Sequence, residues 1–267
     1  MIKIENTEVL GWEAAIRGMR NPMNSWEKSD SEFYDYCNSE YEECNVHTLS
    51  KPLFSKTYDE CPDDEDTRTS YFQMGGVHVG PNDKKLMMNL AKAGSVDAKF
   101  RRMIVVYADI TAPLYWWKEF DTYKIATVSN SCSTMHKIHA KEFTLDDFSH
   151  EHLMNVEDYH QDLPESKENE IRIVGDFNLA LTGVIAALND ARDLYLETKD
   201  QRFWWQMIQL LPSSYNQRRT IMMNYEVLAG IYRSRKDHKL DEWRDFCAWI
   251  KTLPYSELIT LEEKEIV

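Results

Sequence analysis

Hydrophobic positions recur with a helical period in several parts of the chain. One amphipathic face is formed by Leu86, Met87, Leu90 and Ala91. Gly94 follows this pattern directly, as glycine commonly does after the last turn of a helix. The stretch 177–198 has eight apolar residues at helical spacing and no proline, so we expect a long core helix there. Further helices are predicted at residues 8–20, 202–211, 215–233 and 239–253.

Two stretches have the composition of strands. The first seven residues predict a short edge strand. Residues 100–110 are rich in Met, Ile, Val and Tyr, and predict a sheet strand that ends at 111–113. Pro113 then begins an aromatic segment, 114–120, which we expect to be a helix buried on one face. No repeat or flexible linker interrupts the chain, so the pattern favours a single α+β domain over residues 1–267.

The segment at about 25–81 has no sustained period and predicts a long irregular, acidic insertion. Its run Asp59–Asp66 holds much of the negative charge. This run fits a solvated loop, and a metal-binding role is the alternative. The length of the insertion favours a surface excursion or a lid over a site.

Composition limits the classes of ligand. The 267 residues are 43% hydrophobic, which excludes disorder of the whole chain. With 31 Lys and Arg against 45 Asp and Glu, the net charge is −14, opposite to what a nucleic-acid polymer would require. A small anion bound by clustered arginines remains compatible with this charge. No apolar run suits a membrane helix or a signal peptide, so we expect a cytoplasmic protein without a membrane partner.

The five cysteines predict neither a disulfide framework nor a metal site, because they are odd in number, far apart and without CxxC pairing. We expect free thiols. Cys132 lies in a cluster of Ser, Asn and Thr that is compatible with a functional or an unreactive thiol. The chain also has no glycine-rich phosphate loop, zinc-protease motif or nucleophile elbow.

Two segments carry residues suited to ligand binding. Residues 118–137 are dense in hydroxyls and amides, with cations at both ends, so this stretch predicts either a phosphate- or pyrimidine-binding loop or a polar connector. In the second segment, 211–244, Asn224 and Arg235 are eleven residues apart. On one continuous helix they would share a face about 16 Å apart along the axis. Arg235 suits a phosphate or a pyrimidine carbonyl, or alternatively ion pairs with nearby carboxylates.

The second segment has an ordered set of residues that resembles the C-terminal signature of the flavin-dependent thymidylate synthases. These residues are Leu211, Pro212, Arg218, Asn224, Arg235, His238, Glu242 and Arg244. Upstream, Ala91–Gly94, Thr111–Pro113 and Lys118–Phe120 are similar to the family's helix, strand and Arg-Gln-aromatic element. The resemblance covers about 83–137 and 175–250.

The chain departs from the family pattern at several charged positions. The family's Arg-His-Arg-x-x-Ser falls on Thr122-Tyr123-Lys124-x-x-Thr127, where one cation and one hydroxyl remain. The Asn-Glu-x-Ser-x-Arg element falls on Ser129-Asn130-x-Cys132-x-Thr134, which removes a carboxylate and an arginine. An arginine expected before Leu-Pro falls on Ile208.

The resemblance implies a thymidylate synthase-complementing-protein-like α+β fold, in which an antiparallel sheet packs with long helices in a homotetramer. It implies reductive methylation of dUMP to dTMP with FAD as cofactor and with methylenetetrahydrofolate and NADPH as co-substrates. Two alternatives remain: a relative that binds or modifies a different nucleotide on the same scaffold, and a non-catalytic oligomeric binding protein.

Carried over residue by residue, the resemblance implies roles for ten positions and no metal ligand. Arg235 would be the catalytic residue. The substrate would contact Glu119, Lys124, Thr127, Asn130, Cys132, Arg218 and Arg235. The cofactor would contact Tyr123, Lys124, Asn224 and His238.

Overall fold

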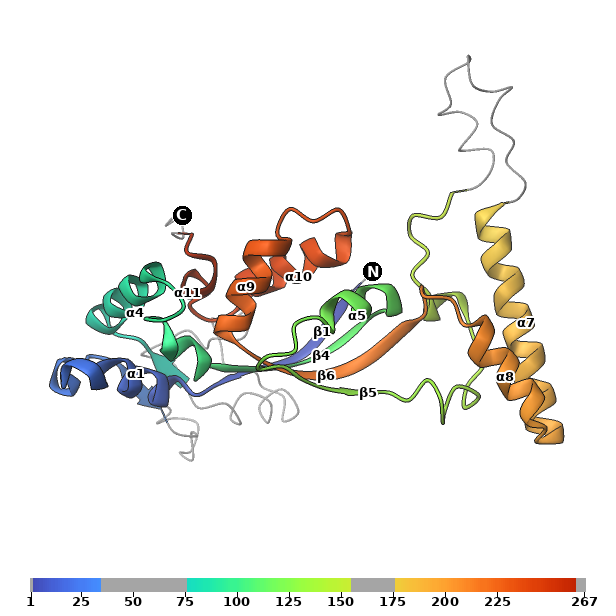
Figure 1. The fold of residues 1–267 in the computed structure, drawn as a ribbon, viewed down its shortest axis with the longest axis horizontal. Helices are drawn as coiled ribbons and strands as arrows, with labels where there is room; N and C mark the ends of the chain where they lie inside the picture. The colour runs from blue at the N-terminus through green and yellow to red at the C-terminus, as the bar shows by residue number, and fades with distance from the viewer. Residues whose placement is uncertain (1, 35–75, 155–175, 263–267) are drawn as a thin grey trace, which may run out of the picture. The chain divides into compact units, whose positions relative to one another are not determined.

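The computed structural model describes residues 2–34, 76–154 and 176–262, which group into two compact units (Figure 1). Unit 1 comprises residues 1–3, 111–122 and 131–219, and unit 2 comprises 4–110, 123–130 and 220–267. The expectation of a single domain stays a prediction. The acidic run at 59–66 lies outside the described residues.

Strands and helices are interspersed along the chain. They are β1 (Lys3–Leu10), α1 (Trp12–Arg20), β2 (Glu32–Tyr34), β3 (Gly76–His78), α4 (Pro81–Ala93), β4 (Val105–Pro113), α5 (Leu114–Phe120), β5 (Val128–Ser131), α7 (Phe177–Thr198), α8 (Gln201–Leu210), β6 (Asn216–Asn224), α9 (Tyr225–Arg235), α10 (Asp241–Thr252) and α11 (Glu257–Thr260). The α+β class with an antiparallel sheet is confirmed.

The main sheet has four strands in the order β1-β4-β6-β5, so β1 is an edge strand as predicted. β2 and β3 form a separate antiparallel pair in which Phe33 is opposite Val77. This pair lies within the segment 25–81, which is therefore not irregular throughout. Helix α1 begins only at Trp12, because the residues up to Leu10 belong to β1.

The prediction of one helix over 215–233 is wrong. Residues Asn216–Asn224 form β6, and only the remainder forms α9. Burial in β6 follows the period of a strand: Ile221 and Met223 are buried, whereas Thr220 is exposed and Met222 is only partly buried. The predicted strand at 100–110 is also shifted. Residues 99–102 form a 3₁₀ turn, and β4 continues through the expected stop at 111–113.

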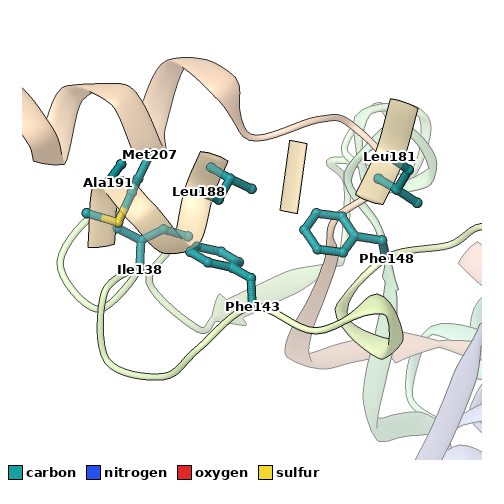
Figure 2. Packing of buried hydrophobic residues seen from close by; sticks show 7 residues of the cluster. All are labelled: Ile138, Phe143, Phe148, Leu181, Leu188, Ala191 and Met207. Atoms are coloured by element: carbon teal, nitrogen blue, oxygen red, sulfur yellow. The ribbon is translucent and has the colours of Figure 1, made fainter. Parts of the chain in front are cut away.

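Helix α7 has its predicted bounds, but it is not buried all round as a core helix. Only Leu181, Leu188 and Ala191 are buried along its 22 residues. These three pack with Met207 of α8 and with Ile138, Phe143 and Phe148 of the preceding segment (Figure 2). Within unit 1, α7 and α8 therefore form a hairpin that buries one face of α7 on this cluster.

Unit 2 contains a buried ion pair at the start of α4. The Asp83 side chain is fully buried and accepts a hydrogen bond from Arg20 Nε at 2.6 Å. The hydroxyls of Ser29 and Ser31 also donate to Asp83, each at 2.6 Å. Burial alone would raise the pKa of Asp83, but these hydrogen bonds and the charge of Arg20 outweigh it, so the pKa lies below its ordinary value.

The same cluster fixes the segment that joins α1 to β2. The other two nitrogens of Arg20 donate to the carbonyls of Ser25 (3.1 Å) and Lys28 (2.9 Å). Asp30 accepts from the backbone N–H groups of Asn82 and Asp83, which have no partner within a helix at its first turn. Gly80 is required next to them, because a Cβ there would lie 2.2 Å from the Asp30 carbonyl oxygen. The segment and α4 are therefore held by one polar cluster.

We expect Asp83→Asn to lower the free energy of unfolding by about 3–5 kcal/mol, because Arg20 would keep a buried charge without its counterion. Urea unfolding at pH 7 measures this. The control is Glu13→Gln, which removes an exposed ion pair with Arg17 and should leave stability nearly unchanged.

The contribution of Asp83 should be complete above its ordinary pKa of 3.8 and decline as the pH falls through the lower pKa of the folded protein. The difference in the free energy of unfolding between the wild type and Asp83→Asn should therefore become smaller in acid. A constant difference down to complete protonation would contradict this assignment.

Candidate functional site

The structure divides the ten predicted site residues between the two units. Seven belong to unit 2: Tyr123, Lys124, Thr127, Asn130, Asn224, Arg235 and His238. Three belong to unit 1: Glu119, Cys132 and Arg218. We describe the two groups separately.

Arg235, the last residue of α9, is held against two aromatic rings. Its Nε donates a hydrogen bond to the Tyr123 hydroxyl at 3.0 Å. Its guanidinium carbon lies 4.7 Å from the ring centre of Trp243 and 5.9 Å from that of Tyr123. The two rings also contact each other edge to face, with centres 6.0 Å apart. We call Arg235, Tyr123 and Trp243 the arginine clamp, because contact with the rings sets the plane of the guanidinium group.

The turn after α9 brings His238 to the same tryptophan. The His238 ring centre lies 6.3 Å from that of Trp243, again edge to face. The His238 N–H donates to the Arg235 carbonyl at 3.0 Å, and Nδ1 accepts from the Leu240 N–H at 3.2 Å. Because Nδ1 acts as an acceptor, a neutral His238 carries its proton on Nε2. Three of the predicted residues, Arg235, Tyr123 and His238, are thus brought together around one ring.

Asn224 has a structural role where β6 turns into α9. It is 5% exposed, and its side-chain oxygen accepts from the Val227 N–H at 3.0 Å, which is the N-cap interaction. Its side-chain nitrogen donates to the Arg102 carbonyl at 3.4 Å. Asn224 and Arg235 lie at opposite ends of α9, but Asn224 has extended backbone angles and does not project from a shared helix face.

Lys124, Thr127 and Asn130 lie on the chain that connects Tyr123 to β5. The Thr127 hydroxyl donates to the Tyr123 carbonyl, which closes this loop. Ala126 has a φ of 58°, the left-handed conformation that a tight turn needs. The side chains of Lys124 and Asn130 are exposed. The polar loop thus places an exposed cation one residue from the arginine clamp.

In unit 1, Cys132 and Arg218 lie on paired backbone segments. The Cys132 N–H donates to the Arg218 carbonyl at 2.9 Å, and Gln217 Nε2 donates to the Cys132 carbonyl at 2.8 Å. The Cys132 thiol is exposed. Glu119 is partly buried in α5, and its carbonyl accepts from the Thr122 N–H at 3.1 Å and hydroxyl at 2.7 Å.

Among the aromatic partners of the cations, the sequence analysis named Tyr123 but missed the tryptophans. Trp243 is fully buried on α10. Apart from its spacing from His238, nothing in the sequence indicated that its ring contacts Arg235. Arg219 has a similar arrangement in unit 1. Its guanidinium carbon lies 4.2 Å from the ring centre of Trp117, and its Nη1 pairs with Asp121 at 2.7 Å.

Cys247 does not have the properties of a nucleophile. Burial raises the pKa of its thiol to about 11, because the lowering effect of Lys251 and Arg235 offsets burial only in part and Asp237 raises the pKa further. Within residues 2–34, 76–154 and 176–262, no three His, Cys, Asp or Glu side chains are grouped as metal ligands. In the same residues, no helix combines the length and apolarity needed to span a membrane.

Comparison with known proteins shows the fold. No protein-family model and no curated protein sequence matches the chain. Two solved structures of the flavin-dependent thymidylate synthase ThyX from Helicobacter pylori, each with FAD and dUMP, are similar to it. In the first, 97% of this chain superposes on 98% of that chain with a TM-score of 0.55. The second covers 97% of both chains with a TM-score of 0.53. Identity is 13% in both. The chain therefore has the ThyX fold with a very different sequence.

We expect Asn224→Ala to lower the free energy of unfolding by about 1 kcal/mol, because the first turn of α9 would lose its cap. Asn224→Ser keeps an oxygen that can accept from Val227 and should recover most of the loss. Urea unfolding of both variants measures this. Equal destabilisation by Ala and Ser would show that the contact with Arg102, and not the cap, is what matters.

Proposed function

We propose that the protein is a flavin-dependent thymidylate synthase-like enzyme in which the arginine clamp binds the uracil nucleotide. The observation that supports this most is the fixed guanidinium group of Arg235, which the family resemblance places on the substrate side, in a chain that has the ThyX fold. An arginine fixed in one plane binds planar acceptors well, because its donors need little reordering.

Arg235 would act on dUMP through electrostatics. When C5 of the pyrimidine becomes nucleophilic, negative charge develops on the ring carbonyls. A guanidinium group aimed at such a carbonyl stabilises this charge, and removal of one such donor typically costs about 3–4 kcal/mol of barrier. Tyr123 and Trp243 act as positioning residues, since they touch Arg235. Thr127 holds the loop that carries Tyr123.

The residues implied for FAD fit it in part. Lys124 is exposed and can pair with a phosphate, and His238 is partly exposed beside Trp243. Asn224 does not fit, because both ends of its side chain take part in the helix cap. When bound, FAD would relay the methylene of methylenetetrahydrofolate and the hydride of NADPH to the pyrimidine. The contribution of this chain would be to bind and orient through Lys124 and His238.

The engagement of Asn224 and the loss of the Arg-His-Arg positions also favour a second candidate. On the same scaffold, the arginine clamp would bind a different nucleotide without FAD. Arg235 would contact a phosphate or a base carbonyl equally well. The two candidates differ in whether flavin binds.

Titration calorimetry measures the affinity for dUMP, and flavin fluorescence measures the binding of FAD. We expect both to bind the wild-type protein and Arg235→Gln to weaken dUMP binding at least tenfold, about 1.4 kcal/mol. The control Arg202→Gln removes an exposed arginine of α8 and should change neither affinity.

Failure of the wild-type protein to bind FAD would overturn the flavin-dependent candidate. Selective binding of another nucleotide, again lost in Arg235→Gln, would then support the second candidate. Unchanged dUMP binding in Arg235→Gln would contradict the role of the clamp.

A homotetramer is part of the proposal, and the outer face of α7 supports it. Leu179 is 70% exposed, and Gly183 and Ala186 follow it on the same face of the helix. Leu194, which is 41% exposed, shares this face about three turns after Gly183. A Cβ at Gly183 would meet no described atom within 4 Å apart from its chain neighbours and the backbone of its own helix. Small residues between exposed leucines would let a helix of a second copy approach closely.

We expect light scattering of the wild-type protein to give four chain masses of 31.5 kDa. The double variant Leu179→Glu/Leu194→Glu should form smaller species, because association would bury two carboxylates. Val96→Glu places the same charge at an exposed apolar residue of unit 2 and serves as the control. A monomeric wild-type protein, or a double variant that remains tetrameric, would contradict this assignment.

A further inference from the structure

A pocket of about 290 Å³ lies within unit 2, between α9, α11 and the end of α4. The pocket and the arginine clamp lie on different faces of α9. Arg233 lines the pocket whereas Arg235 does not, and two residues correspond to about 200° around a helix. None of the ten residues assigned above lines it.

The lining of this pocket has more positive than negative side chains. Its cations are Lys92, Arg101, Arg233 and Lys236, and its one carboxylate is Glu226. The four cations exceed the one carboxylate by three positive charges. The carbonyl ends of α4 and α9 carry about half a negative charge each, so they offset only part of this excess. Lys236 lies 3.8 Å from Glu262, which is closer to Lys251 at 3.2 Å. A net positive charge therefore remains in the pocket.

Arg101 lies in the wall with its charge incompletely compensated. Its side chain is 5% exposed, and its Nη2 donates to the Ala91 carbonyl at 2.9 Å. Its Nε lies 3.4 Å from Glu226 Oε2, longer than the 2.7–2.9 Å typical of charge-assisted hydrogen bonds. Neither atom has a hydrogen-bond partner among the described residues. Burial lowers the pKa of Arg101, and the nearby charge of Arg233 lowers it further against the opposite effect of Glu226.

Arg233 provides the accessible cation. Its side chain is exposed at the pocket, and within the described part of the chain it has neither a hydrogen-bond nor an ion-pair partner. An arginine in this situation can form paired hydrogen bonds with a phosphate without first losing a carboxylate. The pocket also has an apolar part, formed by Ala229 of α9 and by Ile259 and Leu261 at α11.

We propose that this pocket binds a small molecule that joins a phosphate group to an apolar body. The phosphate lies against Arg233 and Lys236, in the field of Arg101, and the apolar body covers Ile259 and Leu261. The volume limits the ligand to a small metabolite and excludes a polymer. The site is independent of nucleotide binding at the arginine clamp, so either can fail without the other.

Titration calorimetry of the full chain with phenyl phosphate tests the proposal, with inorganic phosphate and benzyl alcohol as partial probes. We expect one phenyl phosphate per chain, bound more tightly than either partial probe. The double variant Arg233→Gln/Lys236→Gln should bind at least tenfold more weakly. The control Arg17→Gln/Lys85→Gln removes two exposed cations that do not line the pocket and should bind as the wild type does.

Arg235→Gln changes the clamp but not the pocket, so it should leave phenyl phosphate binding unchanged. The proposal is overturned by absence of binding at concentrations up to about 10 mM. It is equally overturned by unchanged affinity in Arg233→Gln/Lys236→Gln, or by a loss that occurs only in Arg235→Gln. Circular dichroism of each variant confirms that its helices are retained.

Discussion

The junction between β6 and α9 is the constraint on which both proposed sites depend. Asn224 caps the helix, and the next residue, Tyr225, donates its N–H to the Ile104 carbonyl at 3.0 Å. The Tyr225 side chain is fully buried, and its hydroxyl donates to the Pro254 carbonyl at 2.5 Å. These contacts fix the direction in which α9 leaves the sheet. Because α9 carries Arg235 on one face and Arg233 on another, its direction positions both cations at once.

Much of the helical part of the fold could be predicted from periodicity and helix-ending residues. Helix α4 ends before Gly94, and α8 ends just before Leu211-Pro212, as these signals indicate. The error at 215–233 has a physical cause. The apolar residues of β6 are followed without a break by those of α9, and the boundary is one asparagine, which favours an N-cap but is too weak a signal on its own to end a helical pattern. Hydrophobic pattern alone does not locate such a junction.

Sequence reasoning named the cations of the candidate site and Tyr123, but not the tryptophan against which Arg235 packs. Arg235 and His238 are found by spacing, and the structure brings both to one aromatic ring. That ring, Trp243, has the sequence pattern of any buried helix residue, so its contact with a cation depends on the tertiary packing of α10 against α9. The role proposed for Arg233 likewise depends on tertiary packing. Its place in a pocket depends on α11, a four-residue helix that no sequence pattern indicated.

The two edges of the four-stranded sheet are unsuited to further strand pairing. At one edge, Asn6 of β1 has a φ of 50°, and its side chain donates to Asp109 at 2.8 Å. At the other, β5 has four residues, all exposed, of which three are Ser129, Asn130 and Ser131. A kinked edge and a short polar edge are devices by which proteins prevent sheets from joining into aggregates. Amyloid-like growth from this sheet is therefore disfavoured even at a high local concentration of the chain.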